Sequence, residues 1–289
     1  MPFSVCMRDC YDTCSMVSEI DGRLRVRGTP PEHPITAGFL CPKGALLPKW
    51  FHAKDRLKNP LVRTGERGGS GGEFREVGWE EAIGLTARKL KEVIEDYGSE
   101  SVLVYQYAGG DRGGVVNYAF PLRLFHYLNA AVLDYGICDR AGQEALRDVY
   151  GTAVGMDPPE ELRNQRLIVY WGGINAFWTN LHGFTLARRH NLEIWTVDVV
   201  RTETARRSHR FFRIRPDTDV LFALGVAKVM IEEGLYERDF VRENVYGFEE
   251  FRRYVEKLQL DYVSRETGIG GVEEIEEFAR GGFAEKRGG

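Results

Sequence analysis

The sequence contains no run of about 18 apolar residues, the length that a membrane-spanning helix requires. Positive charge is not in excess either, because 39 Lys and Arg residues face 43 Asp and Glu residues, for a net charge of −4. Neither nucleic-acid binding nor a disordered acidic tail is therefore indicated. The motif G-x-G-x-x-G is absent, so a nicotinamide dinucleotide site is not indicated. Residues 1–6 leave no room for a secretory signal, and we expect a cytoplasmic protein.

Cysteine is scarce but unevenly placed. Five cysteines are present among 289 residues, and four of them lie within the first 41. Because the expected compartment is reducing, disulfides are disfavoured, and clustered cysteines more often bind metal. The rest of the composition, 43% hydrophobic and 28% charged residues, is that of an ordinary soluble protein with one large domain or two to three smaller ones.

The first half of the chain predicts one long amphipathic helix and several shorter elements. Residues 79–97 carry apolar side chains near the helical spacing, and Gly98 follows as a helix-ending glycine. The other expected elements are strands at 23–27 and 101–105, a helix at 116–128 kinked by Pro121, and a helix at 139–150 ended by Gly151.

The second half alternates between strands and helices. Strands are expected at 166–171, 192–197 and 211–214, with helices at 179–190 and 219–233 and mostly helical structure from residue 237 onward. This alternation predicts parallel α/β layers. Residues 281–289 are polar and glycine-rich, and we expect a flexible tail there.

The four early cysteines have the spacing Cys6-x3-Cys10-x3-Cys14-x26-Cys41. Three thiolates four residues apart can surround a compact inorganic core that a distant fourth closes, as a [4Fe–4S] cluster demands. A structural zinc site also takes four cysteines, although these usually come as two separated pairs. A disulfide framework is a third interpretation. The spacing favours the iron–sulfur cluster.

The residues around these cysteines carry a resemblance to a known family. The segments Cys6-Met-Arg-Asp-Cys10-Tyr-Asp-Thr-Cys14-Ser and Gly38-Phe-Leu-Cys41-Pro-Lys43-Gly resemble the N-terminal domain of the molybdopterin oxidoreductases. This family includes formate dehydrogenases, nitrate reductases and polysulfide reductases. The resemblance implies that Lys43 lies between the cluster and the pterin, although a lysine outside such a motif is usually a surface residue.

The fifth cysteine, Cys138, stands just before the helix expected to end at Gly151. In the resembling family a cysteine, selenocysteine or serine before such a helix ligates the molybdenum or tungsten, and the resemblance implies this role for Cys138. A helix N-terminus favours a thiolate, and a soft sulfur ligand suits the metal. The alternative is a buried structural thiol, the usual state of a lone cysteine.

Candidate dinucleotide-binding residues follow the strands of the second half. Ligands of parallel α/β folds bind outside the carboxyl ends of the strands, and helix N-termini attract phosphates. The resemblance implies molybdopterin guanine dinucleotide as the ligand, with the candidate residues Gly172, Asn175, Asp198, Thr202, Arg215 and Asp219. The chain departs from the family at Val199-Val200, where Pro-Arg is usual, and at Asp217, where glycine is usual.

The resemblance spans residues 3 to 280 and implies the N-terminal part of a longer α/β architecture, incomplete at the C-terminus. We expect a [4Fe–4S] domain at 1–60, a first α/β segment with the candidate metal ligand at 61–150, and a dinucleotide-binding domain at 151–280, followed by the tail at 281–289. A second polypeptide would supply the missing domains, and an electron-transfer subunit is a further expected partner. Alone, the chain should expose apolar surface where those domains would pack.

The resemblance implies a molybdenum- or tungsten-dependent oxidoreductase in which the cluster relays electrons. Two alternatives remain open. One is an Fe–S electron-transfer subunit or remnant that holds no pterin, and the other is a zinc-bearing interaction module. The sequence does not name the substrate.

Overall fold

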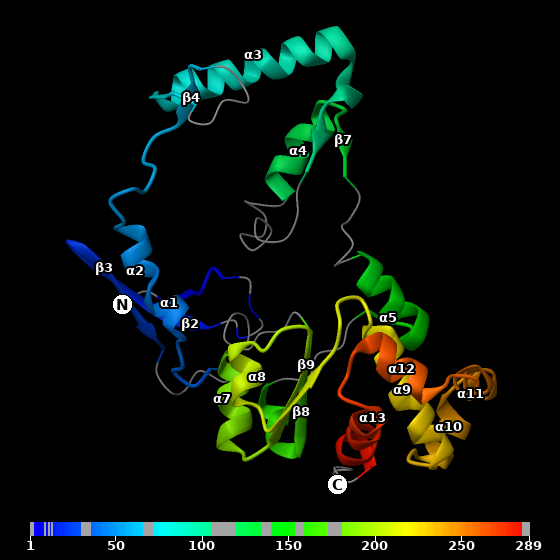
Figure 1. The fold of residues 1–289 in the computed structure, drawn as a ribbon. Coiled ribbons are helices and arrows are strands. Elements are labelled where there is room, and N and C mark those ends of the chain that lie inside the picture. The colour runs from blue at the N-terminus through cyan, green and yellow to red at the C-terminus, as the bar shows by residue number, and fades with distance from the viewer. Residues whose placement is uncertain are drawn as a thin grey trace. The chain divides into compact units, whose positions relative to one another are not determined.

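The computed structural model describes residues 3–8, 10, 12, 14–29, 36–65, 72–105, 119–133, 140–153, 159–172 and 181–284 (Figure 1). The chain divides into two compact units. The first unit comprises Met1–Asp9 and Thr13–Met156, and the second comprises Cys10–Asp12 and Asp157–Gly289. Within the described residues, no helix combines the length and the hydropathy that a bilayer crossing requires.

The first unit contains short strands and mostly exposed helices. Strands β1, β2 and β3 form an antiparallel sheet in that order, β4 and β5 form a hairpin, and β6 and β7 pair in parallel. The elements are β1 (Phe3–Val5), β2 (Ser15–Asp21), β3 (Arg23–Gly28), α1 (Pro42–Ala45), α2 (Leu47–Phe51), β4 (Leu61–Arg63), β5 (Phe74–Glu76), α3 (Trp79–Tyr97), a 3-10 turn (Ser99–Ser101), β6 (Leu103–Val104), α4 (Phe120–Tyr127), β7 (Ala131–Val132) and α5 (Gly142–Tyr150).

Helix α3 has the bounds that the apolar spacing predicts. Glu80 and Glu81 lie in its first turn, where the positive end of the helix dipole stabilises carboxylates. The helix ends at Gly98, whose φ of 85° lies in a region that side chains disfavour. No residue of α3 is buried by the described residues. The amphipathic pattern thus fixes the helix but does not supply a cover for its apolar face.

The second unit is built on three parallel strands in the order β10-β9-β8. Helices connect successive strands, as parallel pairing requires. The elements are a 3-10 segment (Pro159–Asn164), β8 (Leu167–Trp171), α7 (Leu181–Arg189), β9 (Glu193–Asp198), α8 (Glu203–Arg207), β10 (Arg210–Arg213), α9 (Asp219–Glu232), α10 (Arg238–Asn244), α11 (Phe248–Val255), α12 (Leu260–Thr267), α13 (Val272–Ala279) and a final π turn (Arg280–Ala284). The α/β class with a parallel sheet is therefore confirmed.

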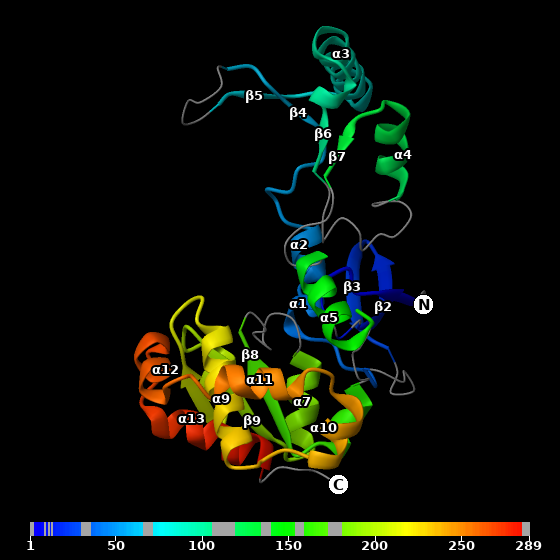
Figure 2. The same cartoon turned by 90° about the vertical axis from the view of Figure 1, so that its right-hand side faces the viewer.

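The two faces of this sheet pack against different helices (Figure 2). Successive strand residues point to opposite faces. On one face, Trp195 and Val197 of β9 pack against α9, α12 and α13. On the other face, Ile194 and Tyr170 pack against Phe184 of α7. Both faces are covered, and β8, whose five residues are all apolar or aromatic, accordingly does not alternate.

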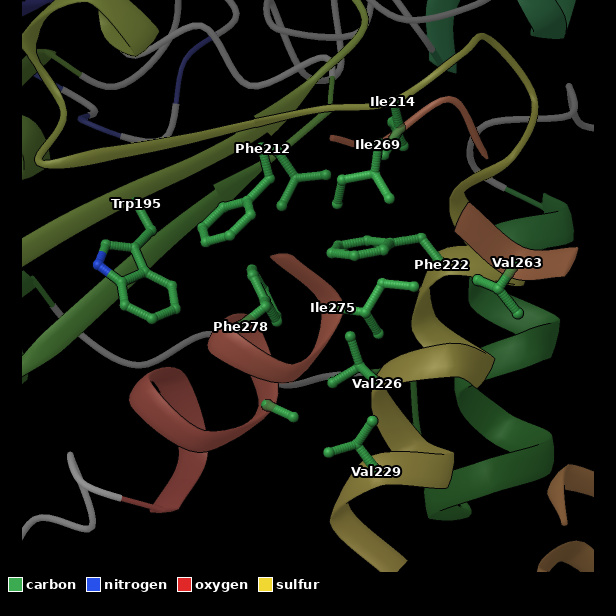
Figure 3. Packing of buried hydrophobic residues seen from close by; sticks show 12 residues of the cluster. Trp195, Phe212, Ile214, Phe222, Val226, Val229, Val263, Ile269, Ile275 and Phe278 are labelled. Atoms are coloured by element: carbon green, nitrogen blue, oxygen red, sulfur yellow. The ribbon is translucent and has the colours of Figure 1, made fainter. Parts of the chain in front are cut away.

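Aromatic rings fill the larger of the two cores (Figure 3). The Phe278 ring lies 4.9 Å from the Phe212 ring, 5.2 Å from Phe222 and 5.5 Å from Trp195, measured between ring centroids. The first two contacts are edge-to-face, the arrangement that the ring quadrupoles favour. Phe278 is fully buried. Phe278, together with the buried Ile275 and Ala279, therefore packs helix α13 into this core.

Three elements differ from the sequence-based expectations. The strand expected at 101–105 is paired only at Leu103–Val104 and follows a 3-10 turn. Pro121 lies in the first turn of α4, where a proline is tolerated, and the expected helical residues 116–118 lie outside the described residues. Residues 281–284 of the expected tail form a helical turn, and Gly281 and Gly282 lie so close to the Trp195 ring that a Cβ on either would approach it to 3.0 Å.

Candidate functional site

Two of the predicted cluster ligands flank the first two strands. Cys6 directly follows β1, and Cys14 directly precedes β2. The last paired residues of these two strands are Val5 and Ser15. The Cys6 amide donates to the Cys14 carbonyl at 2.8 Å, which extends the ladder by one step. Cys14 is buried. The β1–β2 sheet thus places two ligand positions side by side within the first unit.

The other cluster residues lie on short turns. Cys41 is the N-cap residue of α1 and is buried, and Pro42 fits the first helical position because its missing N–H has no acceptor there. Lys43, on the same helix, is half-buried and lines a cavity of ≈370 Å³ together with Met7, Arg8 and Trp50. The structure therefore places Lys43 beside Met7 and Arg8, and its position between a cluster and a pterin stays a prediction.

The four cysteines have the donor chemistry that a cluster needs, but the described side chains are not gathered into a metal site. All four are thiols, and two are buried. Cys10 belongs to the second unit, whereas Cys6, Cys14 and Cys41 belong to the first. In the part of the chain that the structure describes, no three His, Cys, Asp or Glu side chains gather as a metal site. The cluster thus stays a prediction from the sequence.

A buried carboxylate next to Cys10 was missed by the sequence interpretation. The Asp12 side chain is only 2% exposed, and its Oδ2 accepts a hydrogen bond of 3.0 Å from the backbone amide of His182 in α7. An aspartate two residues from a predicted ligand gives no distinctive signal in the sequence. Its burial, and its partner 170 residues away, become visible only in the fold.

The carboxyl edge of the parallel sheet brings together several of the dinucleotide candidates. Gly172, directly after β8, has a φ of 52°, a value that side chains rarely adopt, and its amide donates to the Val197 carbonyl at 2.8 Å. Asp219, at the start of α9, accepts from Nε1 of Trp171 at 2.8 Å. The carboxylate therefore fastens α9 to the end of β8.

Asp198 and Thr202 shape the loop after β9. The Oδ1 atom of Asp198 accepts from the amides of Val199 at 2.7 Å and Val200 at 3.3 Å, so this carboxylate folds back onto its own loop. Thr202 is the N-cap of α8, and its hydroxyl accepts from the Ala205 amide at 3.2 Å. These bonds give both residues a structural role that the sequence interpretation did not include.

Arg215 lies after β10 but binds a helix end. Its Nη1 donates to the carbonyls of Arg265 at 2.9 Å and Glu266 at 3.3 Å, near the C-terminus of α12, where cations are favoured. Its own amide donates to the Thr267 carbonyl at 2.7 Å. Asp217 nearby has a φ of 65°. The usual family glycine at this position thus corresponds to a left-handed backbone that Asp217 retains.

Two predicted site residues, Cys138 and Asn175, lie outside the described residues. The candidates Gly172, Asp198 and Asp219 meet at one edge of the sheet through the contacts above, and Arg215 lies after the neighbouring strand. Dinucleotide contacts of these residues stay predictions, and the side chains of Asp198, Arg215 and Asp219 each form a hydrogen bond within the second unit.

Residues 56–241, more than half of the chain, match the family described as molybdopterin oxidoreductase. The chain belongs to the molybdopterin oxidoreductase family. The "Probable oxidoreductase YoaE" of Bacillus subtilis is 34% identical over 271 residues, which are 92% of this chain and 39% of that protein. Dimethyl sulfoxide reductase DmsA of Escherichia coli is 28% identical over 272 residues, 86% of this chain and 33% of that protein.

A solved structure shares the fold. Acetylene hydratase from Pelobacter acetylenicus superposes with a TM-score of 0.74 at 23% identity, over 95% of this chain and 38% of that one. The chain thus spans less than two fifths of these three proteins. The family consists of oxidoreductases that carry a molybdopterin cofactor. The activity of this chain itself stays a proposal.

Proposed function

We propose that this chain is part of, or a subunit of, a molybdopterin-dependent oxidoreductase containing molybdenum or tungsten and a [4Fe–4S] cluster. The observation that carries the proposal is the Cys6, Cys10, Cys14 and Cys41 spacing directly before the family match at residues 56–241. Four thiolates are the ligand set of a cubane cluster. The cytoplasmic location expected from the sequence stays a prediction.

Different residues of this chain would bind the cluster, the metal and the dinucleotide. The four cysteines would hold the cluster, which passes single electrons, and Lys43 would lie between cluster and pterin. At the sheet edge, Gly172 leaves room for a phosphate to approach the backbone, and Asp198 offers a carboxylate oxygen to a guanine edge or a ribose hydroxyl. We propose Cys138 as the ligand of the molybdenum or tungsten.

A second polypeptide, or further chain, would complete the enzyme. The apolar face of α3 is open in the first unit: the side chains of Trp79 and Ile83 are 66% and 62% exposed. With Leu57 and Leu124 they line a cavity of ≈480 Å³. Monomeric proteins rarely leave such apolar surface uncovered. Because the chain spans 39% of its relative YoaE, a polypeptide equivalent to the remaining part is the partner that fits this face.

Metal analysis of anaerobically purified protein tests the cluster. We expect about four irons per chain, as a cubane requires, and the Cys10→Ala variant should lose iron or convert to a three-iron form. Zinc in place of iron, or an unchanged brown chromophore in Cys10→Ala, would show that the assignment is wrong. Iron with no molybdenum or tungsten in the assembled protein would favour the alternative, an electron-transfer subunit or remnant that holds no pterin.

The departures at Val199, Val200 and Asp217 give that alternative some support, since an added carboxylate beside a phosphate-binding turn disfavours an anion. We expect the isolated chain to bind the pterin dinucleotide poorly, because affinity depends on enclosure of the ligand. Stoichiometric cofactor recovered from this chain alone would contradict the need for a second part.

X-ray absorption at the metal edge tests Cys138 in the assembled enzyme. We expect Cys138→Ala to lower the number of sulfur ligands at the metal and to abolish turnover while sparing the iron content, and Cys138→Ser to retain partial activity. An unchanged sulfur count would return Cys138 to the status of a structural thiol.

A further inference from the structure

The Asp12 carboxylate is buried beside a predicted cluster ligand, and the ligand set itself does not use it. A buried carboxylate is costly unless hydrogen bonds compensate for the lost water. The compensation for Asp12 includes the 3.0 Å hydrogen bond from the His182 amide to Oδ2. Asp12 shares the short segment Cys10–Asp12 with the predicted ligand, and this segment belongs to the second unit although the residues on both sides of it belong to the first.

The donor of this bond is well suited to a carboxylate. His182 is the second residue of α7, and the amides of a first helical turn lack acceptors within their own helix. The positive end of the helix dipole also favours a negative charge there. His182 is itself only 2% exposed. The bond is thus shielded from water, which strengthens it.

Helix α7 packs against the parallel sheet of the second unit. Its side chains Phe184 and Ala187 are buried against Tyr170 and Ile194 of the parallel sheet. The Phe184 and Tyr170 rings lie 5.9 Å apart between centroids. A segment fastened to the first turn of α7 is therefore fastened to the sheet of the second unit.

Tyr170 shows that the same buried region reaches the end of β8. Its side chain is 3% exposed, and within the described residues its hydroxyl has no hydrogen-bond partner. Burial, and then the negative charge of Asp12, raise the pKa of the Tyr170 hydroxyl, which therefore stays protonated. Asp12 thus acts electrostatically on the residue two positions before Gly172, at the edge where we propose the dinucleotide binds.

We propose that Asp12 is a positioning residue that fastens the turn bearing Cys10 to the first turn of α7, and so holds this cluster ligand on the dinucleotide-binding unit. The inference rests on the proposed [4Fe–4S] cluster for its functional meaning, although the attachment itself does not require the cluster. Asp12 binds no iron in this proposal; it limits the positions that the Cys10 thiolate can take.

The test compares Asp12→Ala and Asp12→Asn with wild type, all purified anaerobically as the full chain. Asp21→Ala is the matched control, because Asp21 is an exposed aspartate at the end of β2. The readouts are hydrogen exchange at the His182 amide, iron per chain, and the midpoint potential of the cluster followed by electron paramagnetic resonance. A merely structural residue would move the first readout but not the last.

We expect His182 amide exchange to accelerate at least tenfold in Asp12→Ala, and the iron content to fall below half. Asp12→Asn keeps an acceptor oxygen, so it should retain iron; the loss of one negative charge near the cluster should raise its midpoint potential. Asp21→Ala should resemble wild type in all three readouts.

Other outcomes overturn the proposal in distinguishable ways. If Asp12→Ala kept the wild-type exchange rate at the His182 amide and the full iron content, Asp12 would not attach the Cys10 segment to α7. Retained iron with an unchanged potential in Asp12→Asn would remove the functional role even if Asp12→Ala fails to fold. Wild-type protein without iron would overturn the cluster instead, and accelerated exchange in Asp12→Ala would then still support the attachment to α7.

Discussion

Helices α3 and α9 have different sequence patterns and opposite surroundings: α3 is amphipathic, whereas α9 is apolar on most of its sides. Helix α3 is the longer, with 19 residues, and none of them is buried by the described residues. Helix α9 has 14 residues and buries five, among them Phe222, Val226 and Val229. Helices α11, α12 and α13 all pack against α9. The difference follows the pattern of each helix, because a helix that is apolar on most sides is usually buried, as well as the elements that surround it.

This comparison separates two kinds of information in a sequence. Apolar residues at helical spacing show which face of a helix avoids water. They do not show what covers that face, which depends on other segments or other chains. In the second unit the cover is supplied by the chain itself, through Phe278 and its neighbours. In the first unit, the described residues leave Trp79 and Ile83 largely exposed.

The largest effect should come from removing the ring that joins α13 to α9. Phe278→Ala deletes a fully buried phenylalanine packed on Phe212 and Phe222, and such truncations cost about 3–5 kcal/mol of unfolding free energy. Urea denaturation followed by tryptophan fluorescence measures the loss. Phe240→Ala is the control, because Phe240 is 61% exposed in the same unit, and its loss should stay within about 0.5 kcal/mol. Equal losses in the two variants would mean that the aromatic core does not hold α13.

A smaller, opposite effect is expected at the start of α9. Asp217 is exposed and has a φ of 65°, so Asp217→Gly removes left-handed strain and should stabilise the second unit by about 0.5–1 kcal/mol after the entropic cost of glycine. Thermal unfolding of wild type and variant measures it. Asp217→Ala should give no such gain, since alanine is at least as strained there. A lower melting temperature for the glycine variant would show that the Asp217 carboxylate makes a stabilising contact.

The ion pair between α9 and the residue after α13 should give a weaker, pH-dependent effect. The hydrogen bond and charge of Arg280 lower the pKa of Glu233 below its ordinary 4.5. Because the folded-state pKa is the lower one, the stabilisation is present above about pH 4.5 and is lost as the pH falls through the folded value. The pair is largely exposed, so its contribution should be small and should weaken further in salt. In Arg280→Gln, the unfolding free energy should depend less on pH in the acid range. The same pH dependence in wild type and variant would show that the pair does not contribute to stability.

The sequence predicted much of the second unit, because its signals are local. The three strands lie within about one or two residues of the expected positions, and the carboxyl edge of the sheet carries Gly172, Asp198 and Asp219 as parallel topology requires. The position of Asp217, where glycine is usual in the family pattern, also has a local explanation: its backbone has the positive φ that glycine adopts most easily.

Non-local contacts were beyond the sequence interpretation. The capping of α12 by Arg215, the bond between Trp171 and Asp219, and the attachment of Asp12 to α7 join residues 48 to 170 positions apart. No periodicity records such pairs. The gathering of the four cysteines is non-local in the same sense, and the structure places Cys10 in a different unit from the other three.

A substitution on the exposed face of α3 should have the smallest effect on the stability of this chain and a large effect on its assembly with a partner. Ile83→Ser should change the unfolding free energy of this chain by no more than about 0.5 kcal/mol, because the side chain is already 62% exposed. The same substitution should weaken binding to the part of Bacillus subtilis YoaE that this chain does not cover by about tenfold or more, since a buried anchor residue contributes over 1 kcal/mol to an interface. Lys91→Ser on the same helix is the control for helix propensity, as Lys91 makes only an exposed ion pair with Glu95. Titration calorimetry gives the affinities and chemical denaturation the stabilities. If Ile83→Ser instead destabilised the isolated chain by 2 kcal/mol or more, α3 would already be covered within the chain, and the contrast with α9 would disappear.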